Sequence, residues 1–224
     1  MVKNNLKYLK SEFSTIFNIS CFYKKPHFSQ EGEDIIINKY FSHKNNGFYV
    51  DVGAHHPFRY SNTYLLYKKG WNGINIDPTP GVKRLFDRTR KRDTNLELAI
   101  DKKSGKKVLF IFKDQALNTL SKTFANIIIK SGQSKLLNTI SVKTQRLDNI
   151  LDKYLKKEKQ IDLLNIDVEG YEMNVLNSIN WAKYRPNVII IENIYKTDEL
   201  RKYLSDLNYL LYANTLSSNI YVQK

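Results

Sequence analysis

The stretch GFYVDVGAHHPFRYSNT, residues 47–63, decides the fold class. An apolar run is interrupted by one acid, Asp51, and is followed by Gly53 and a polar turn. A buried strand, a glycine and a turn in this order open the nucleotide-binding unit of α/β proteins. A phosphate-binding turn needs several glycines, because its backbone must approach the pyrophosphate closely. This turn has His55 and His56 instead, so we expect a ligand without a pyrophosphate.

Apolar segments alternate with amphipathic segments along most of the chain. Strands are predicted at residues 47–52, 73–76, 96–100, 106–112, 139–143, 161–166 and 187–191. Helices are predicted at residues 29–41, 63–69, 82–92, 124–130, 148–154, 171–179 and 197–207. A final antiparallel hairpin is predicted at residues 209–212 and 219–222. Fully apolar strands that alternate with helices indicate an α/β fold, in which helices cover both faces of a parallel sheet.

Two regions of the chain differ in character. In residues 1–26, apolar side chains recur every three or four positions with lysines on the other face, which predicts a basic amphipathic helix. It either packs on the domain or lies on an acidic membrane surface, and both alternatives stay open. Residues 27–224 contain no repeat and no low-complexity linker, and their length suits one α/β domain.

The composition constrains the partners and the compartment. A net charge of +14, from 36 basic and 22 acidic residues, favours an anionic substrate, nucleic acid or an acidic membrane surface. A general bias toward lysine explains the charge equally well. One cysteine, Cys21, allows no intrachain disulfide, and we find neither a signal peptide nor an apolar run of the roughly 20 residues that a membrane span needs. We therefore expect a cytoplasmic protein, with peripheral membrane contact through residues 1–26 as the alternative.

Four of the predicted strands end in an acid, and these acids are Asp51, Asp77, Asp167 and Glu192. Ligands of open α/β sheets bind at the carboxyl ends of the strands. Asp77 comes about one strand–helix–strand unit after Asp51, the position of an acid that accepts hydrogen bonds from ribose hydroxyls. Asp51 is expected to hold a cation, while Gly53 allows a close approach of the backbone. S-adenosylmethionine, a cationic nucleoside without phosphates, meets these demands.

A second acidic segment, IDLLNIDVEGYEMNVL, covers residues 161–176. We expect Asp167 and Glu169 to lie in the same crevice as Asp51, whereas Glu172 is typical of an acid in the first turn of a helix. Asp167 together with the pair 192–193 would place oxygen ligands on neighbouring strand ends, as Mg²⁺ requires. A divalent metal therefore stays open.

Several motifs occur in a characteristic order between residues 29 and 193. They are SQEGED, FYVDVGAHHP with SNT, GWNGINIDP, TQRLDNIL, and LLNIDVEGYE with VIIIEN. Together they resemble the FkbM family of S-adenosylmethionine-dependent methyltransferases. The resemblance implies a Rossmann-like seven-stranded methyltransferase fold, with a mostly parallel sheet and an antiparallel last strand. It also implies O-methylation of a sugar hydroxyl in glycan, capsule or natural-product synthesis.

The resemblance also implies roles for individual residues. Asp51, Gly53 and Ala54 fall on the first cofactor motif and Asp77 on the ribose acid. The motif near the point of methyl transfer matches Asp167, Glu169 and Gly170. Asn165 departs from the family, since many relatives have lysine there, so no substrate contact is carried over at that position.

The predicted function is therefore S-adenosylmethionine-dependent O-methylation of an anionic glycan or nucleotide-linked sugar. Asp167, Glu169 or His55 would accept the proton of the hydroxyl group, although the two histidines can equally serve to fix the turn. Asp167 is also expected to contact the cofactor. One alternative is a nucleic-acid methyltransferase, but the sequence has no Asn-Pro-Pro-Tyr type motif for a flipped base. The other is a non-catalytic cofactor-binding scaffold that docks to a membrane complex through residues 1–26.

Overall fold

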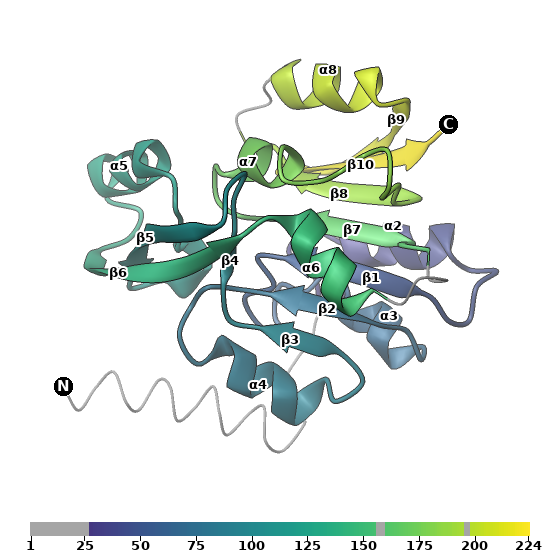
Figure 1. The fold of residues 1–224 in the computed structure, drawn as a ribbon, viewed down its shortest axis with the longest axis horizontal. Helices are drawn as coiled ribbons and strands as arrows, with labels where there is room; N and C mark the ends of the chain where they lie inside the picture. The colour runs from purple at the N-terminus through teal and green to yellow at the C-terminus, as the bar shows by residue number, and fades with distance from the viewer. Residues whose placement is uncertain (1–26, 156–159, 195–197) are drawn as a thin grey trace.

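The computed structural model describes residues 27–155, 160–194 and 198–224. Its main sheet has seven strands in the order β3-β2-β1-β7-β8-β10-β9 (Figure 1). Their bounds are β1 Phe48–Val52, β2 Asn72–Ile76, β3 Thr94–Leu96, β7 Leu163–Ile166, β8 Val188–Glu192, β9 Tyr209–Asn214 and β10 Ser218–Gln223. The first five strands in this order are parallel, and β10 is antiparallel to both neighbours. The predictions of an α/β fold, a mostly parallel seven-stranded sheet and an antiparallel last strand are confirmed.

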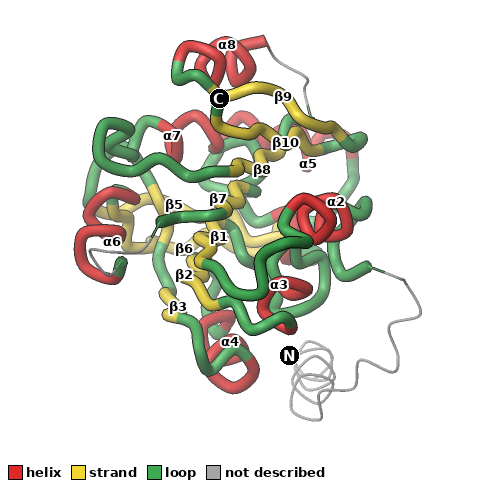
Figure 2. The backbone as a smooth tube through the Cα atoms, turned by 90° about the vertical axis from the view of Figure 1, so that its right-hand side faces the viewer, coloured by secondary structure: helices red, strands yellow, loops and turns green. Residues whose placement is uncertain are grey.

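Helices cover both faces of the main sheet (Figure 2). Their bounds are α2 Glu33–Tyr40, α3 Tyr64–Lys68, α4 Val82–Thr89, α6 Leu147–Tyr154, α7 Glu172–Leu176 and α8 Asp198–Asp206. Helices α2 and α3 contribute to the core on one face, and α6, α7 and α8 contribute to the core on the other. In the part of the chain that the structure describes, no helix is long and apolar enough to span a bilayer. The amphipathic helix predicted within residues 1–26 lies outside the described residues.

The side chains of β1 alternate between the two cores. Val50 and Val52 pack on the face of α6 and α7, and Tyr49 packs on the face of α2 and α3. Asp51 lies on the same face as Tyr49, because successive side chains of a strand point to opposite faces. It is therefore a buried residue within β1 rather than a residue beyond its end.

A second, three-stranded sheet has the order β4-β6-β5. Its strands are β4 Ala99–Ile100, β5 Gly105–Phe112 and β6 Leu136–Gln145, with the 3₁₀ helix η2 Gln115–Leu117 and helix α5 Lys122–Ser131 between β5 and β6. In Figure 1 this sheet and α5 lie beside the end of the main sheet toward which the β2 and β3 arrows point. It therefore stands at the carboxyl edge, where ligands of such folds bind.

Some predicted elements have other bounds or another place in the fold. The single strand predicted at residues 96–100 is wrong, because Leu96 pairs with β2 in the main sheet whereas Ala99 pairs with Thr144 in the second sheet. The helix predicted at residues 82–92 ends at Thr89, since the following Arg90 turns into the interior and is fully buried.

Candidate functional site

A cavity opens between the carboxyl edge of the main sheet and the second sheet. Its empty space is about 760 Å³, part of it open to solvent. Five residues singled out from the sequence line it, and they are Gly53, His55, Asp77, Asp167 and Glu169. The segment around β4 and β5 contributes Leu98, Ala99, Ile100 and Leu109 to the apolar part of the wall, and the main sheet contributes Val52 and Ile76.

Asp77 directly follows β2 and is 7% exposed. Each of its carboxylate oxygens accepts one backbone hydrogen bond, from His55 N at 2.9 Å and from Thr79 N at 2.8 Å. Burial raises the pKa of Asp77, and these hydrogen bonds oppose the rise. A carboxylate has about four lone-pair sites, so the side chain keeps acceptor capacity toward the cavity.

Asp51 is not among the residues that line this cavity. Its carboxylate accepts hydrogen bonds from Thr63 Oγ1 at 2.7 Å and from Asn165 Nδ2 at 2.8 Å. In the register of the sheet, Asp51 lies between Asn165 of β7 and Asn75 of β2. Asn75 in turn donates to Asn95 of β3, so a row of buried polar side chains crosses four strands. This geometry gives Asp51 a role in positioning the loop through Thr63.

Gly53 directly follows β1 and lies against the backbone that directly follows β7. A Cβ atom on Gly53 would lie 1.6 Å from the carbonyl oxygen of Asp167, and the residue has φ +83°. Only glycine fits, and the immediate reason is the neighbouring strand rather than a ligand. Ala54 packs against Val82 and Phe86 of α4, and it is not among the residues lining the cavity.

The two histidines after β1 have different surroundings. His56 is buried, and its Nδ1 accepts hydrogen bonds from the backbone N–H groups of Phe58 and Arg59, so it fixes the turn. His55 lines the cavity, and its Nε2 lies 3.1 Å from the guanidinium of Arg59. Burial and the charge of Arg59 lower the pKa of His55 to about 4. Burial also holds the pKa of His56 well below its usual range.

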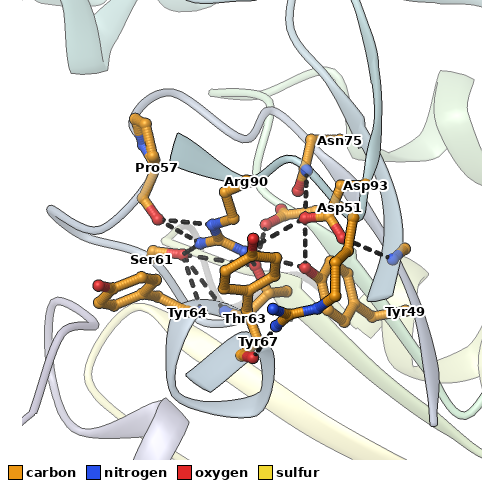
Figure 3. A network of polar contacts seen from close by, with 12 residues as sticks. Tyr49, Asp51, Pro57, Ser61, Thr63, Tyr64, Tyr67, Asn75, Arg90 and Asp93 are labelled. Carbon is orange, nitrogen blue, oxygen red and sulfur yellow. Dashed lines mark hydrogen bonds and ion pairs between the residues drawn. The ribbon is translucent and has the colours of Figure 1, made fainter. Parts of the chain in front are cut away.

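Arg90 directly follows α4 and donates hydrogen bonds to the loop between β1 and α3 (Figure 3). It is fully buried, and its guanidinium donates to four acceptors, the carbonyl of Pro57 and the hydroxyl groups of Tyr49, Ser61 and Thr63. Aromatic rings surround it, from Tyr49, Tyr64, Tyr67 and Phe86. Because Thr63 donates to Asp51, one hydrogen-bonded chain runs from Arg90 into β1. The sequence gives one indication of this position. Arg90 comes four residues after the buried Phe86, and residues four apart lie on the same face of a helix.

Three carboxyl groups converge at the ends of β7 and β8. One oxygen each from Asp167, Glu169 and Glu192 lies within 4.8 Å of the other two. Asp167 and Glu192 share a side-chain hydrogen bond. Burial raises the pKa of all three groups, and repulsion between the neighbouring carboxylates raises it further. We call these three residues the acidic cluster.

Glu169 is the most constrained member of the acidic cluster. Its φ of 56° lies in the left-handed region, which is unusual for a residue with a side chain. The residue is 9% exposed, and its Oε2 is buried without a hydrogen-bond partner. The neighbouring Glu172 instead accepts hydrogen bonds from the N–H groups of Val168 and Gly170, as expected of an acid in the first turn of a helix.

A second cavity of about 870 Å³, also open to solvent, lies on the other side of the acidic cluster. Glu192 lines it, whereas Asp167 and Glu169 line the first cavity. The apolar part of its wall consists of Phe124, Ile127, Met173, Ile194 and Leu200. Its polar part consists of Ser121, Thr123, Glu172, Asn174, Glu192, Asn193 and Glu199. The acidic cluster therefore lies between two spaces that two different molecules can occupy.

Sequence reasoning missed the cavity residues outside the main sheet. Asn118 Nδ2 donates to Thr79 Oγ1 at 3.1 Å, which joins the second sheet's loop to the segment after Asp77. Thr119 Oγ1 donates to the carbonyl of Glu169 at 2.7 Å. These polar residues lie in an irregular part of the sequence without a motif, and only the three-dimensional contact shows their place.

The sequence comparison identifies the family. The family model "Methyltransferase FkbM domain" matches residues 51–211, from Asp51 into β9. The chain belongs to the FkbM methyltransferase family. Both cavities and the acidic cluster of this FkbM domain draw most of their residues from the matched region. The resemblance on which the sequence analysis relied is thereby confirmed.

Two further comparisons were made with the FkbM domain. Among curated protein sequences, none matches it significantly. Among solved structures, it is similar to an O-methyltransferase from Bacillus cereus in complex with SAH, with 11% sequence identity and a TM-score of 0.39. That alignment covers 96% of this chain and 91% of the other. The family assignment rests on the sequence model.

Proposed function

We propose that this FkbM domain transfers a methyl group from S-adenosylmethionine to a hydroxyl group of a sugar, glycan or nucleotide-linked intermediate. The charge of the first cavity carries the proposal. Asp77, Asp167 and Glu169 line it and, among the residues that the structure describes, no lysine or arginine does. Phosphate groups need cations or several backbone N–H donors, whereas a sulfonium and an ammonium group are favoured beside carboxylates.

The parts of the first cavity suit the parts of this cofactor. Asp77 keeps acceptor capacity for the two ribose hydroxyls, and the apolar wall with Leu98, Ile100 and Leu109 suits the adenine ring. Asp167 and Glu169 suit the positively charged sulfonium. When bound, S-adenosylmethionine supplies an electrophilic methyl group, so much of the catalysis is positioning of the acceptor.

The second cavity suits the acceptor. Its apolar side chains can pack against the hydrophobic face of a sugar ring, and its serine, threonine and asparagine side chains can bind hydroxyl groups. A hydroxyl group that enters from this side meets the acidic cluster before it reaches the first cavity. Within the described residues no lysine or arginine lines this cavity either, so an anionic group of the acceptor would have no cationic side chain to pair with there.

The proton of the acceptor hydroxyl goes to a carboxylate of the acidic cluster. The low pKa of His55, about 4, makes it a weak base, and its Nε2 already faces Arg59. Asp167 and Glu169 have raised pKa values, which bring a carboxylate closer to the basicity of a general base at neutral pH. A positive charge in the first cavity favours their ionised forms.

Calorimetry with S-adenosylmethionine and S-adenosylhomocysteine tests the cofactor assignment. We expect the wild type to bind both and Asp77→Asn to bind them about 1.5–3 kcal/mol more weakly, because an amide nitrogen cannot accept a ribose hydroxyl. Asp206→Asn, at an exposed position of α8, is the control and should bind like the wild type. Absence of binding to the wild type at millimolar ligand would overturn the proposal.

A further inference from the structure

We propose that Asp167, Glu169 and Glu192 together bind one divalent cation of the oxygen-preferring class, Mg²⁺, Mn²⁺ or Ca²⁺, between the two cavities. The inference deepens the proposed function, on which its catalytic meaning rests. The cation would lie where the acceptor hydroxyl and the methyl group have to meet.

The distances suit a single ion. One oxygen from each residue lies within 4.8 Å of the other two. Ligands on opposite sides of one ion are about 4.2 Å apart for Mg²⁺ and up to about 5.2 Å apart for Ca²⁺, given metal–oxygen distances of about 2.1 and 2.6 Å. Carboxylates are the preferred ligands of both ions. Three protein ligands leave further coordination positions for water or for a hydroxyl group of the acceptor.

The unpartnered atom of the acidic cluster is the second observation. Glu169 Oε2 is buried and accepts no hydrogen bond, although a buried carboxylate oxygen is costly without a partner. The backbone of Glu169 also adopts a left-handed conformation, which is unfavourable for a residue with a side chain. A cation would supply the partner that this oxygen lacks.

The walls of both cavities, as far as the structure describes them, contain no other positively charged side chain. Asp167 and Glu169 line the first cavity and Glu192 lines the second, and the described residues around both cavities include no lysine or arginine. Asp167 and Glu192 share a side-chain hydrogen bond, and the repulsion that remains among the three carboxyl groups favours a cation between them.

A bound cation would act on the acceptor rather than on the cofactor's binding site. A divalent ion lowers the pKa of a coordinated hydroxyl group and orients it. It would thereby hold the reacting oxygen beside the acidic cluster, where a carboxylate oxygen that does not bind the ion accepts the hydroxyl proton.

Titration of the full chain with Mn²⁺, followed by the electron paramagnetic resonance of the free ion, tests the inference without any activity measurement. We expect one Mn²⁺ to bind to each wild-type chain and to be displaced by excess Mg²⁺ or Ca²⁺. Glu169→Gln and Glu192→Gln should each bind Mn²⁺ at least about 10-fold more weakly, because loss of even an outer-shell partner has effects of that size. Glu199→Gln, exposed in the second cavity and outside the cluster, is the matched control.

Two results would overturn the inference. One is a wild type that binds no Mn²⁺ up to millimolar concentration, which would mean that protons satisfy the cluster. The other is a folded Glu169→Gln or Glu192→Gln variant, with a wild-type melting temperature, that binds Mn²⁺ as the wild type does. Calorimetry with S-adenosylmethionine in the presence of a chelator separates the two proposals. If the chain binds the cofactor but not Mn²⁺, only the cation site is overturned. If it binds Mn²⁺ but not the cofactor, the cation site stands and the proposed function is overturned.

Discussion

At the scale of single residues, Glu169 combines strain, burial and an unpartnered oxygen in one position. Its φ is 56°, it is 9% exposed, and its Oε2 has no hydrogen-bond partner. Residues in such strained conformations cluster at functional sites, where the surrounding structure holds them in place. Here the hydrogen bond from Thr119 Oγ1 to the carbonyl of Glu169 helps to keep the backbone of Glu169 in this conformation.

Glu169→Gln should lower turnover by roughly 100-fold or more, in line with typical general-base contributions, while cofactor affinity changes little. The reason is that the amide can neither accept the hydroxyl proton nor carry the charge that the transition state requires. Single-turnover methyl transfer and calorimetry on the same preparation measure the two quantities. Near wild-type turnover in Glu169→Gln, matched by the exposed Asp206→Asn of α8 as control, would show that Glu169 has only a structural role.

At the scale of elements, the contact between β1 and β7 brings the first motif and the acidic cluster together. Gly53 at the end of β1 leaves no space for a Cβ atom against the carbonyl of Asp167. Arg90, at the end of α4, holds the loop that follows through four acceptors (Figure 3). The turn that contains His55 and His56 is therefore held in place at both of its ends.

Gly53→Ala should destabilise the fold much more than Gly132→Ala. Both glycines have a left-handed φ, which costs an alanine about 1–2 kcal/mol. Gly132 has open space around it, whereas Gly53 adds an overpacking cost of about 1–3 kcal/mol or more. Urea unfolding of the two variants gives the difference. Equal losses of unfolding free energy would mean that β1 and β7 separate at little cost.

Arg90→Lys should destabilise the fold by about 1–3 kcal/mol and weaken cofactor binding. A lysine ammonium has three donors in place of the forked guanidinium, so at least one of the four buried acceptors loses its partner. Arg88→Lys, two positions earlier and exposed, is the control. Thermal melting and calorimetry measure the two effects, and a variant as stable as the control would contradict the structural role of Arg90.

The elements also differ in how well they could be predicted from the sequence. The strands with continuous apolar runs were predicted nearly to their ends, because burial on both faces leaves a strong pattern. The second sheet was not recognised as a separate unit, since pairing between Ala99 and Thr144 is a contact between distant segments. Asp51 and Asp77 look alike in the sequence, and only the register of the sheet shows that Asp51 faces Asn165 whereas Asp77 lines the cavity.

At the scale of the whole molecule, buried ionisable groups should shape the pH dependence of stability. Burial lowers the pKa of His55 to about 4 and holds that of His56 well below its usual range. The unfolded chain therefore binds more protons than the folded one between about pH 6.5 and the low pKa values of the folded state. Each histidine therefore lowers the free energy of unfolding as the pH falls below about 6.5, and it has no such effect above that pH.

His56→Asn should reduce this loss of stability in acid. The asparagine oxygen can accept the hydrogen bonds of Phe58 N and Arg59 N, but it does not titrate. Below about pH 6.5, the wild type should lose up to about 1.4 kcal/mol per pH unit more than the variant. Urea unfolding between pH 4.5 and 7.5 measures both slopes, with His43→Asn at an exposed position as control. Parallel curves for the wild type and His56→Asn would contradict the account.

The function proposed for this chain is methyl transfer from S-adenosylmethionine to a hydroxyl group beside the acidic cluster. Incubation of the full chain with S-adenosylmethionine labelled in its methyl group, and with separate extracts of glycan, RNA and DNA, tests it most directly. We predict label in the glycan fraction, as an ether that resists mild base, and a loss of roughly 100-fold in Glu169→Gln. Label in RNA or DNA would indicate the nucleic-acid alternative. A chain that binds the cofactor and labels none of the three fractions would contradict the claim.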